Sequence, residues 1–336
     1  MGRISQIGKI TILGDGGWGT TLARLLALKG YEVRLWGAFK DNIRLIAKKK
    51  VNQKFLPGIK LPDSIEFTSN LCEAVKGANL IVLAVPSQYL RQVLKQLKHL
   101  NISSGKFLSV IKGIEIRTLM RISQVIRQEL KNGIRLAVLS GPTIALEVAK
   151  GIPTTAVISS PDKKLAESLQ HIFMTERFRV YTNSDMIGVE LGGSLKNIIA
   201  IACGICDGLG FGANTKAALL TRGLLEIGRL GAAMGARKET FSGLTGLGDL
   251  VTTCISPYSS NRFVGEQIGK GKGLKKILSK MEMVAEGVTT AKSAYQLSKK
   301  YKISMPITEE VYFVLYKNKN PLKAVNDLMT RERKEE

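Results

Sequence analysis

The hydrophobic pattern of the chain differs between its two halves. In the first half, short apolar runs alternate with amphipathic segments of helical spacing. The apolar runs predict strands at 10–13, 32–35, 80–85, 106–111, 135–140 and 155–159. The amphipathic segments predict helices that include 42–50, 89–100 and 118–130. Since several runs are continuously apolar, we expect a parallel sheet covered on both faces, which is a doubly wound α/β domain.

The second half carries helical patterns only. After about residue 186 the predicted helices are 189–204, 213–234, 238–243, 261–269, 275–281, 290–301 and 308–316. No Pro- or Ser-rich linker separates the halves, so we expect the two domains to share an interface. The sequence predicts a Rossmann-like, doubly wound sheet at residues 1–188, followed by an all-helical domain at 189–336.

A glycine-rich turn joins the first predicted strand to a helix expected over 20–29. The turn reads Gly14-Asp15-Gly16-Gly17-Trp18-Gly19. Gly14 permits a tight turn, Gly16 lets a pyrophosphate approach the backbone, and Gly19 lets the helix lie close to the strand. The N–H groups of the helix N-terminus then face the phosphates. The pattern predicts a dinucleotide site, and the alternative is a tight turn without a ligand.

The composition is that of an ordinary globular protein, with 44% hydrophobic and 23% charged residues among 336. We find no apolar stretch of the roughly 18 residues that would span a bilayer. The N-terminus lacks a signal-peptide cleavage pattern. We therefore expect a cytoplasmic protein that does not insert into membranes.

The formal net charge of +23 raises the question of a nucleic-acid partner. The positive residues are mostly scattered lysines, and aromatic residues make up only 6% of the chain. We therefore expect no nucleic-acid partner. A positive field also attracts small phosphorylated anions, which suits a small-molecule substrate.

The cysteine and histidine residues offer little chemistry. Cys203 and Cys206 form a C-x-x-C pair, but no second pair or nearby His completes a zinc site, so we expect buried thiols and no metal. His99 and His171 lie outside the Gly-rich and strand-end loops, and we expect both at the surface. If the dinucleotide is a nicotinamide cofactor, the reaction is hydride transfer, which needs a group that exchanges a proton with the substrate oxygen. That group must then be Lys, Asp, Glu or Tyr.

The segment 190–197 suggests a lysine for that role. Gly192 and Gly193 let another backbone approach closely, and an apolar helix face follows Lys196. Loss of solvation lowers the pKa of a lysine toward neutrality, as a general base requires. The alternative is a surface lysine whose charged end reaches water.

Many further motifs, in order, resemble the bacterial-type NAD(P)-dependent glycerol-3-phosphate dehydrogenases. The resemblance runs from about Ile10 to Asp327. Its motifs include Gly14–Leu22, Asn52–Pro57, Val85-Pro86-Ser87, Lys112-Gly113, Ser140–Thr143, Glu147–Ala149, Gly192–Asn197, Gly212–Asn214, Thr221–Gly223, Gly246–Asp249, Thr252–Cys254 and Met305–Glu310. The resemblance implies that the helical domain is 6-phosphogluconate-dehydrogenase-like.

The resemblance also implies an activity and a set of site residues. Such enzymes interconvert dihydroxyacetone phosphate and sn-glycerol 3-phosphate by hydride transfer with NAD(P)H, which supplies phospholipid synthesis. Lys196 would exchange a proton with the C2 oxygen. The implied substrate-binding residues are Lys112, Gly141, Thr143, Lys196, Asp249, Ser259, Ser260 and Asn261. The implied cofactor-binding residues are Gly14, Gly16, Gly17, Trp18, Gly19, Lys112, Ala145, Ser260, Val284 and Glu286.

Two of these residues also have plainer interpretations. Lys112 could simply solvate a loop, and Asp249 could cap the helix that follows a Gly-rich turn.

The sequence departs from the family at two places. Ser260 stands where relatives usually carry an Arg that would contact the substrate phosphate, and a serine cannot form the bidentate charged pair. Arg262 could replace that Arg only if its loop turned it inward, which we do not expect.

The second departure is Gly37-Ala38, where a strict NAD enzyme would carry an acid for the ribose hydroxyls. Lys40, Arg34 or Arg44 could instead hold a 2′-phosphate, so the sequence favours NADP or dual use. Asp15, an acid where relatives usually carry a small apolar residue, is unexplained.

Two other functions stay open at this point. One is a related two-domain dehydrogenase acting on another hydroxy acid or sugar acid. The other is a nucleotide-binding sensor that keeps the fold without turnover, an option to which Ser260 gives some weight. For the assembly we expect a homodimer.

Overall fold

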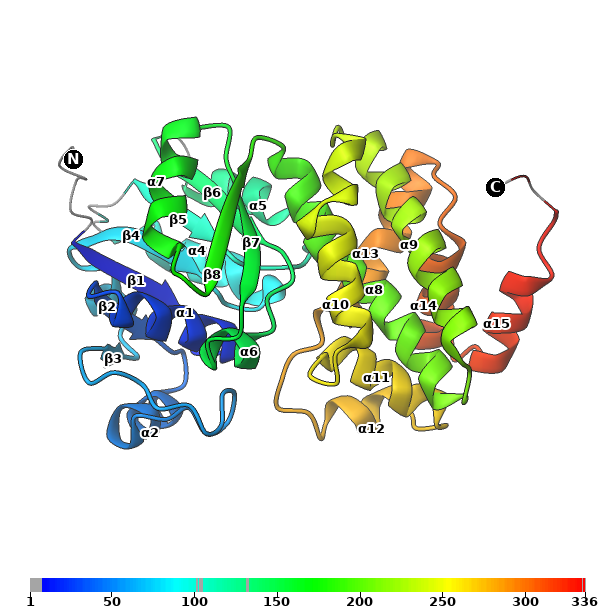
Figure 1. Ribbon diagram of the computed structural model, residues 1–336, viewed down its shortest axis with the longest axis horizontal. Helices are drawn as coiled ribbons and strands as arrows, with labels where there is room; N and C mark the ends of the chain where they lie inside the picture. Colours follow the sequence, from blue (N-terminus) through cyan, green and yellow to red (C-terminus); the bar gives the residue numbers. More distant parts are fainter. Residues whose placement is uncertain (1–7, 101, 103–104, 131–132, 334, 336) are drawn as a thin grey trace.

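The chain folds into an eight-stranded sheet flanked by helices, which is joined to a bundle of helices (Figure 1). The computed structural model describes residues 8–100, 102, 105–130, 133–333 and 335. The α/β part lies at one end of the long axis and the helical part at the other (Figure 1). The expected fold class is confirmed.

The strands are ordered β3-β2-β1-β4-β5-β6-β7-β8 across the sheet. Their bounds are β1 (Lys9–Leu13), β2 (Glu32–Trp36), β3 (Glu66–Thr68), β4 (Ala78–Leu83), β5 (Lys106–Ser109), β6 (Arg135–Ser140), β7 (Thr154–Ser159) and β8 (Phe178–Asn183). All neighbours pair in parallel except β6 and β7, which are antiparallel. The expectation of a wholly parallel sheet is therefore wrong at this pair.

Helices cover both faces of the sheet. They are α1 (Gly17–Leu28), α2 (Lys40–Lys49), α3 (Leu71–Val75), η1 (Ser87–Tyr89), α4 (Leu90–Leu97), α5 (Ile122–Leu130), α6 (Ala145–Ala149) and α7 (Lys163–Phe173). Alternate residues of β1 serve the two faces, as the strand period requires. Ile12 packs in a buried cluster with residues of α1 and α7, whereas Leu13 packs with residues of α4 and α5.

The helical domain begins immediately after β8. It contains α8 (Met186–Gly208), α9 (Ala213–Ala233), η2 (Lys238–Ser242), η3 (Leu244–Gly248), α10 (Asp249–Ile255), α11 (Ser260–Gly269), α12 (Leu274–Leu278), α13 (Glu286–Tyr301), α14 (Pro306–Tyr316) and α15 (Pro321–Met329). The sequence reading missed α15, which begins at an Asn-capped Pro. Helix α8 lies at the centre of this domain, with α9, α10, α11 and α13 packed around it.

Helices α8 and α11 are in direct backbone contact. A Cβ added at Gly204 would lie 2.0 Å from the carbonyl oxygen of Arg262. A Cβ added at Gly265 would lie 2.0 Å from the carbonyl oxygen of Ile201. Because real Cβ atoms do not approach backbone so closely, glycine at both positions fixes how α11 sits on α8.

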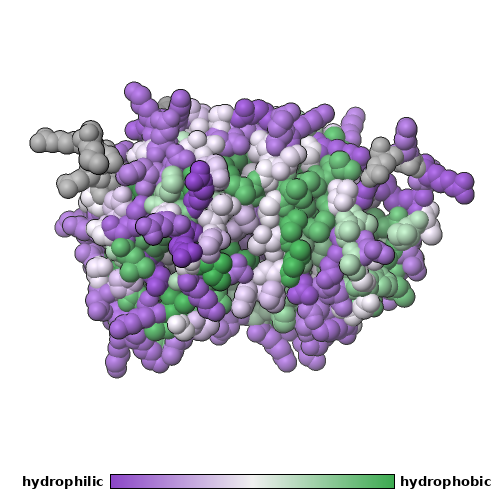
Figure 2. Space-filling view, viewed as in Figure 1, coloured by the Kyte–Doolittle hydropathy of each residue, from purple (hydrophilic) through white to green (hydrophobic). Residues whose placement is uncertain are grey.

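Helix α8 is long and apolar enough to cross a membrane by length and composition alone, so the expectation that no segment reaches this length is wrong. The apolar window of α8 is completely buried inside the fold, which is typical of a core helix. By contrast, hydrophilic side chains cover much of the face shown in Figure 2, where an apolar strip runs over part of the helical domain.

Candidate active site

Helix α8 carries Lys196 at the junction between the two domains. A Cβ at Gly192 would lie 2.6 Å from the Thr245 carbonyl oxygen, and one at Gly193 would lie 2.4 Å from the Ser140 hydroxyl. The two glycines therefore let α8 lie against the end of β6 on one side and the turn before α10 on the other. The expected close approach of another backbone is confirmed at Gly192, whereas the groups nearest Gly193 are the side chains of Ser140 and Lys112.

Asp249 reaches the same place from α10. A π-helical turn, η3, precedes it, with the Gly248 N–H donating to the Gly243 carbonyl at 3.2 Å. Such turns are frequent at functional sites because they displace the following residues from regular helical register. The capping interpretation of Asp249 is wrong: Gly248 occupies the N-cap position, and the Asp249 carboxylate binds two lysines instead.

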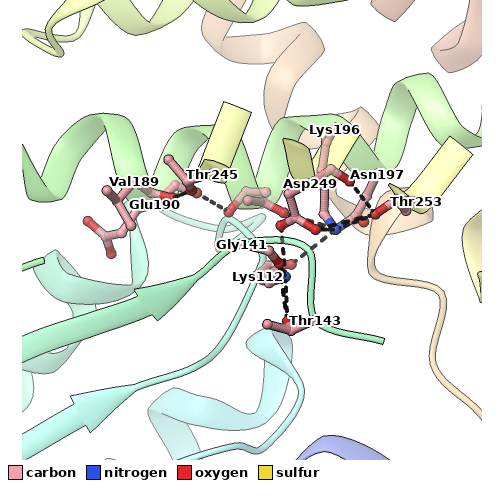
Figure 3. Close-up of polar contacts among 12 residues, drawn as sticks. Lys112, Gly141, Thr143, Val189, Glu190, Lys196, Asn197, Thr245, Asp249 and Thr253 are labelled. Carbon is pink, nitrogen blue, oxygen red and sulfur yellow. Dashed lines mark hydrogen bonds and ion pairs between the residues drawn. The ribbon is translucent and has the colours of Figure 1, made fainter. Parts of the chain in front are cut away.

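The Asp249 carboxylate bridges Lys196 and Lys112 (Figure 3). Its Oδ1 accepts from Lys196 Nζ, and its Oδ2 accepts from Lys112 Nζ at 2.7 Å. Asp249 is 1% exposed and Lys196 is 5% exposed. The two lysine nitrogens therefore occupy both oxygens of one buried carboxylate, and the three side chains form one hydrogen-bonded unit.

Burial lowers the pKa of Lys196 to about 8. The charge of Asp249 opposes this shift, and the positive charge of Lys112 adds to it. An amine with this pKa is present in both protonation states near neutral pH, which is what proton exchange with a substrate oxygen requires. The alternative of a surface lysine at this position does not fit its burial.

The two lysines differ in the donors they leave free. Lys112 Nζ donates to the Gly141 carbonyl at 2.8 Å, the Thr143 hydroxyl at 3.3 Å and Asp249. Lys196 Nζ has only two acceptors among the described residues, Asp249 and the Thr253 hydroxyl. An ammonium has three N–H donors, so Lys196 keeps one for a ligand.

Lys112 lies in the segment after β5, and Gly141 and Thr143 lie in the loop after β6. Gly141 has a φ of +131°, a conformation that side chains rarely adopt, and its carbonyl accepts from both Lys112 and the Thr143 hydroxyl. These strand ends form the edge at which α/β sheets bind ligands. Lys112 is thus tied into the site, which excludes the simple loop-solvating role.

Two carboxylates join the domains beside the site, one from the buried Glu190 and one from the half-buried Glu286. Glu286, at the start of α13, accepts from the Ser87 N–H at 2.7 Å and from the Ser87 hydroxyl. Glu190 in α8 binds Arg121 and accepts from the Ser123 N–H at 2.7 Å. Burial raises the pKa of Glu286, and the hydrogen bonds from Ser87 partly offset that shift.

The N-terminus of α11 borders the site through Asn261. The Asn261 side chain donates to Asn197 at 3.0 Å and accepts from the Gly287 N–H at 2.8 Å. The Ser259 hydroxyl caps α11, and the Ser260 hydroxyl donates to the Val284 carbonyl at 3.2 Å. Within the described part of the chain, neither serine contacts Lys196 or Asp249.

Arg262 points away from this corner. Its Nε donates to Asp207 at 2.7 Å, so it does not replace the Arg that Ser260 displaces.

The Gly14–Gly19 turn fits a dinucleotide. Gly14 has a φ of +129°, and a Cβ on Gly19 would lie 2.0 Å from the Gly14 carbonyl oxygen. A Cβ on Gly16 would meet no atom of the described residues within 4 Å, so this backbone is open to a ligand. Helix α1 begins at Gly17, three residues earlier than expected, and none of the described side chains caps it. Its N-terminal N–H groups are therefore available to a pyrophosphate.

Of the other expected cofactor residues, Ala145 lies beside this turn and Trp18 belongs to it. A Cβ on Gly17 would lie 3.8 Å from the Ala145 Cβ, and the Thr21 hydroxyl donates to the Ala145 carbonyl at 3.1 Å. The indole Nε1 of Trp18 is buried and has no partner among the described residues. Val284 and Glu286 approach from the helical domain, at the start of α13.

Two residues of the lysine site, which is formed by Lys112, Asp249 and Lys196, were not predicted from the sequence. Thr253 accepts from Lys196 and donates to the Asp249 carbonyl at 2.7 Å. Asn197 donates to the Lys112 carbonyl at 3.4 Å and accepts from Asn261 at 3.0 Å. The signal for Thr253 was its spacing, since it lies one helical turn after Asp249 and therefore on the same face of α10.

The structure also shows where the cysteines and histidines lie that were given no catalytic or metal-binding role. Cys203 and Cys206 are buried free thiols, as expected, and His99 and His171 are exposed, as expected. Among the described residues, no group of three His, Cys, Asp or Glu side chains is placed to hold a metal.

Comparison with known proteins decides the family. Residues 9–166 match the model of the NAD-dependent glycerol-3-phosphate dehydrogenase N-terminus, and residues 185–326 match that of the C-terminus. The chain belongs to the NAD-dependent glycerol-3-phosphate dehydrogenase family. The resemblance inferred from the motifs is confirmed.

Relatives in this family match over nearly their whole length. The chain is 52% identical over 325 residues to the glycerol-3-phosphate dehydrogenase (NAD(P)+) of Bacillus pumilus strain SAFR-032, covering 96% of this chain and 94% of the relative. Among solved structures, glycerol-3-phosphate dehydrogenase from Coxiella burnetii is 38% identical with a TM-score of 0.93, covering 96% of this chain and 99% of that one. The Saccharomyces cerevisiae enzyme is 30% identical with a TM-score of 0.80, covering 97% and 100%.

Proposed function

We propose that this protein is an NAD(P)-dependent oxidoreductase that interconverts dihydroxyacetone phosphate and sn-glycerol 3-phosphate, and so supplies glycerol 3-phosphate for phospholipid synthesis. The observation that carries the proposal is the buried Lys112–Asp249–Lys196 unit. It lies at the carboxyl ends of the strands, where such a sheet binds its ligands. Family membership supports the substrate.

The cofactor would lie along the glycine turn. Gly14, Gly16, Gly17 and Gly19 shape the open backbone at the N-terminus of α1. A bound nicotinamide group supplies the hydride to C2 of the ketone, or accepts it from the alcohol.

Lys196 exchanges the proton. During reduction its free N–H donates to the C2 oxygen, so that the negative charge developing there is neutralised as it forms. The neutral amine left behind then takes a proton from water. Asp249 and Thr253 hold Nζ throughout, which keeps the third N–H in one direction.

Lys112 has the complementary role. Its charge, tied to Asp249 and the Gly141–Thr143 loop, attracts the phosphorylated substrate and lowers the pKa of Lys196. The N-terminus of α11 closes the site through Ser259, Ser260 and Asn261. Ser260 binds phosphate more weakly than an Arg at the same position would. We propose 1–188 as the Rossmann-like cofactor-binding domain and 189–336 as the helical domain of substrate binding and proton transfer.

A steady-state assay tests the proposal. We expect the protein to oxidise NADH or NADPH when dihydroxyacetone phosphate is added, and to do so far more slowly with unphosphorylated dihydroxyacetone. Turnover of another keto acid in its place would identify a related dehydrogenase. Cofactor binding without turnover of either cofactor would identify a nucleotide-binding sensor.

The setting of the reaction is part of the same proposal. A cytoplasmic location without membrane insertion agrees with the complete burial of the apolar window of α8. The small phosphorylated substrate suits the net charge of +23, which then needs no nucleic-acid partner. A homodimer stays a prediction, to be tested by the mass of the protein in solution.

A further inference from the structure

The corner beyond the end of β2 is where a Rossmann-like domain tells NAD from NADP. An acid about 20 residues after the glycine turn commonly binds the ribose 2′-hydroxyl there. Here that position is Gly37-Ala38-Phe39, which carries no acid. Ala38 and Phe39 are exposed, so neither side chain is committed to the core.

A carboxylate nevertheless lies at this corner, supplied by the glycine turn itself. Asp15 is only 8% exposed. A Cβ added at Gly37 would lie 2.6 Å from both the Asp15 Cγ and its Oδ2. The Asp15 carboxylate therefore occupies the space that a side chain at position 37 would enter, and Gly37 is required to make room for it.

The Asp15 side chain is held in this orientation. Asn42, in the first turn of α2, donates to its Oδ2 at 2.6 Å, and Asn52 donates to its backbone carbonyl at 2.7 Å. Burial raises the pKa of Asp15, while the Asn42 hydrogen bond and the charge of Lys54 act in the opposite direction. A carboxylate has about four acceptor positions, so the contact with Asn42 leaves capacity for a hydroxyl donor.

The basic residues expected at this corner do not offset this charge. Arg34 pairs with Glu66 at 2.6 Å and donates to the Glu73 and Ala74 carbonyls. Lys40 and Arg44 are exposed, and the structure gives neither a contact with Asp15.

We propose that Asp15 determines cofactor choice, by accepting a hydrogen bond from the adenosine ribose hydroxyls and repelling a 2′-phosphate, so that this protein prefers NAD(H) to NADP(H). The inference rests on the dinucleotide site of the proposed function and reverses the NADP preference expected from the sequence. A carboxylate accepts from a ribose hydroxyl, whereas beside a phosphate it is a second anion in a partly dry site.

Direct binding tests this without relying on catalysis. Dissociation constants for NADH and NADPH are measured separately by nucleotide fluorescence, without substrate. We expect the wild-type protein to bind NADH at least tenfold more tightly than NADPH. Asp15→Asn keeps the shape and removes the charge, and Asp15→Ser removes the carboxyl group. We expect both to reduce the preference at least fivefold, mainly through tighter NADPH binding.

Glu32→Gln is the matched control, because it removes one carboxylate from the opposite, amino end of β2. It should change the preference less than twofold. Thermal melting of each variant shows that it is folded. Equal binding of both cofactors by the wild type, or an unchanged preference in both folded Asp15 variants, would overturn the proposal. Preferential NADH binding by a protein that does not reduce dihydroxyacetone phosphate would support Asp15 while refuting the proposed activity.

Discussion

The glycine turn and the lysine site lie in one molecule but are built on opposite principles. The turn depends on residues that have no side chain. Gly16 leaves the backbone open, Gly19 lets the helix pack against the Gly14 carbonyl, and Gly14 adopts a positive φ. The lysine site depends on charged side chains, since Asp249 forms an ion pair with both Lys112 and Lys196. The turn should therefore be damaged by adding a methyl group, and the lysine site by removing a charged group.

Removal of the Lys196 amine is the sharpest test of that difference. We expect Lys196→Ala to lower kcat by roughly 100- to 10,000-fold, the usual contribution of a general acid or base. NADH should still bind, since the glycine turn lies in the other domain. Stopped-flow or steady-state rates together with a fluorescence titration measure both properties. Near-normal kcat would place the proton donor elsewhere.

Adding a methyl group to the turn tests the other half of the comparison. Gly19→Ala should lower the free energy of unfolding by roughly 2–3 kcal/mol, because its Cβ would overlap the Gly14 carbonyl. Gly16→Ala is the matched control: with no atom within 4 Å, it should change stability by less than about 0.5 kcal/mol. Denaturant unfolding measures both.

Cofactor binding separates these two glycines further. Gly16→Ala should weaken NADH binding by about tenfold, although it leaves the fold intact, because its methyl group points into the space left for the pyrophosphate. Equal effects of the two variants on the free energy of unfolding would show that Gly16 and Gly19 do not differ in how closely they are packed.

The pH dependence of the rate tests the protonation of Lys196 without a mutation that changes the shape of the site. Since Lys196 must be protonated to reduce the ketone, kcat/KM for reduction should fall above pH about 8, approaching tenfold per pH unit. Oxidation needs the neutral amine and should rise through the same range. Asp249→Asn removes a charge that raises the pKa of Lys196, so it should move both limbs to lower pH. Limbs that stay in place would show that another group titrates.

Restoring a cation at position 260 should give the smallest effect. Ser260→Arg should lower the KM for dihydroxyacetone phosphate by roughly fivefold, since a partly exposed ion pair contributes up to about 1 kcal/mol. Ser260→Gln, which adds length without charge, is the control and should leave the KM near the wild-type value. An unchanged KM in the Arg variant would mean that phosphate is bound elsewhere.

The periodicity of the chain predicted most of the fold but missed the strands β3 and β8. β3 is three residues long and only partly buried, so it lacks the apolar run that marked the other strands. β8 alternates buried and exposed positions at its start, and it lies at the edge of the sheet. Both elements are defined by pairing with a neighbour that is distant in sequence, and local pattern does not record that pairing.

The site shows the same limit. Motifs pointed to Lys112, Lys196 and Asp249, but their connection through one carboxylate depends on how α10 meets the sheet edge. The role of Asp15 was hidden for a related reason. Its partners are Gly37, in the segment after β2, and Asn42, in α2. Only the folded turn brings the carboxylate to them.

The shared carboxylate has a consequence for motion between the domains. Lys196 and Asp249 both belong to the helical domain, held on neighbouring helices, whereas Lys112 belongs to the sheet. Any movement of the two domains apart would therefore separate Lys112 from Asp249 and leave the Lys196–Asp249 pair intact. Loss of a positive neighbour would raise the pKa of Lys196. The readiness of the lysine to release its proton is thus coupled to closure, so that proton transfer is easiest when the two domains enclose the substrate.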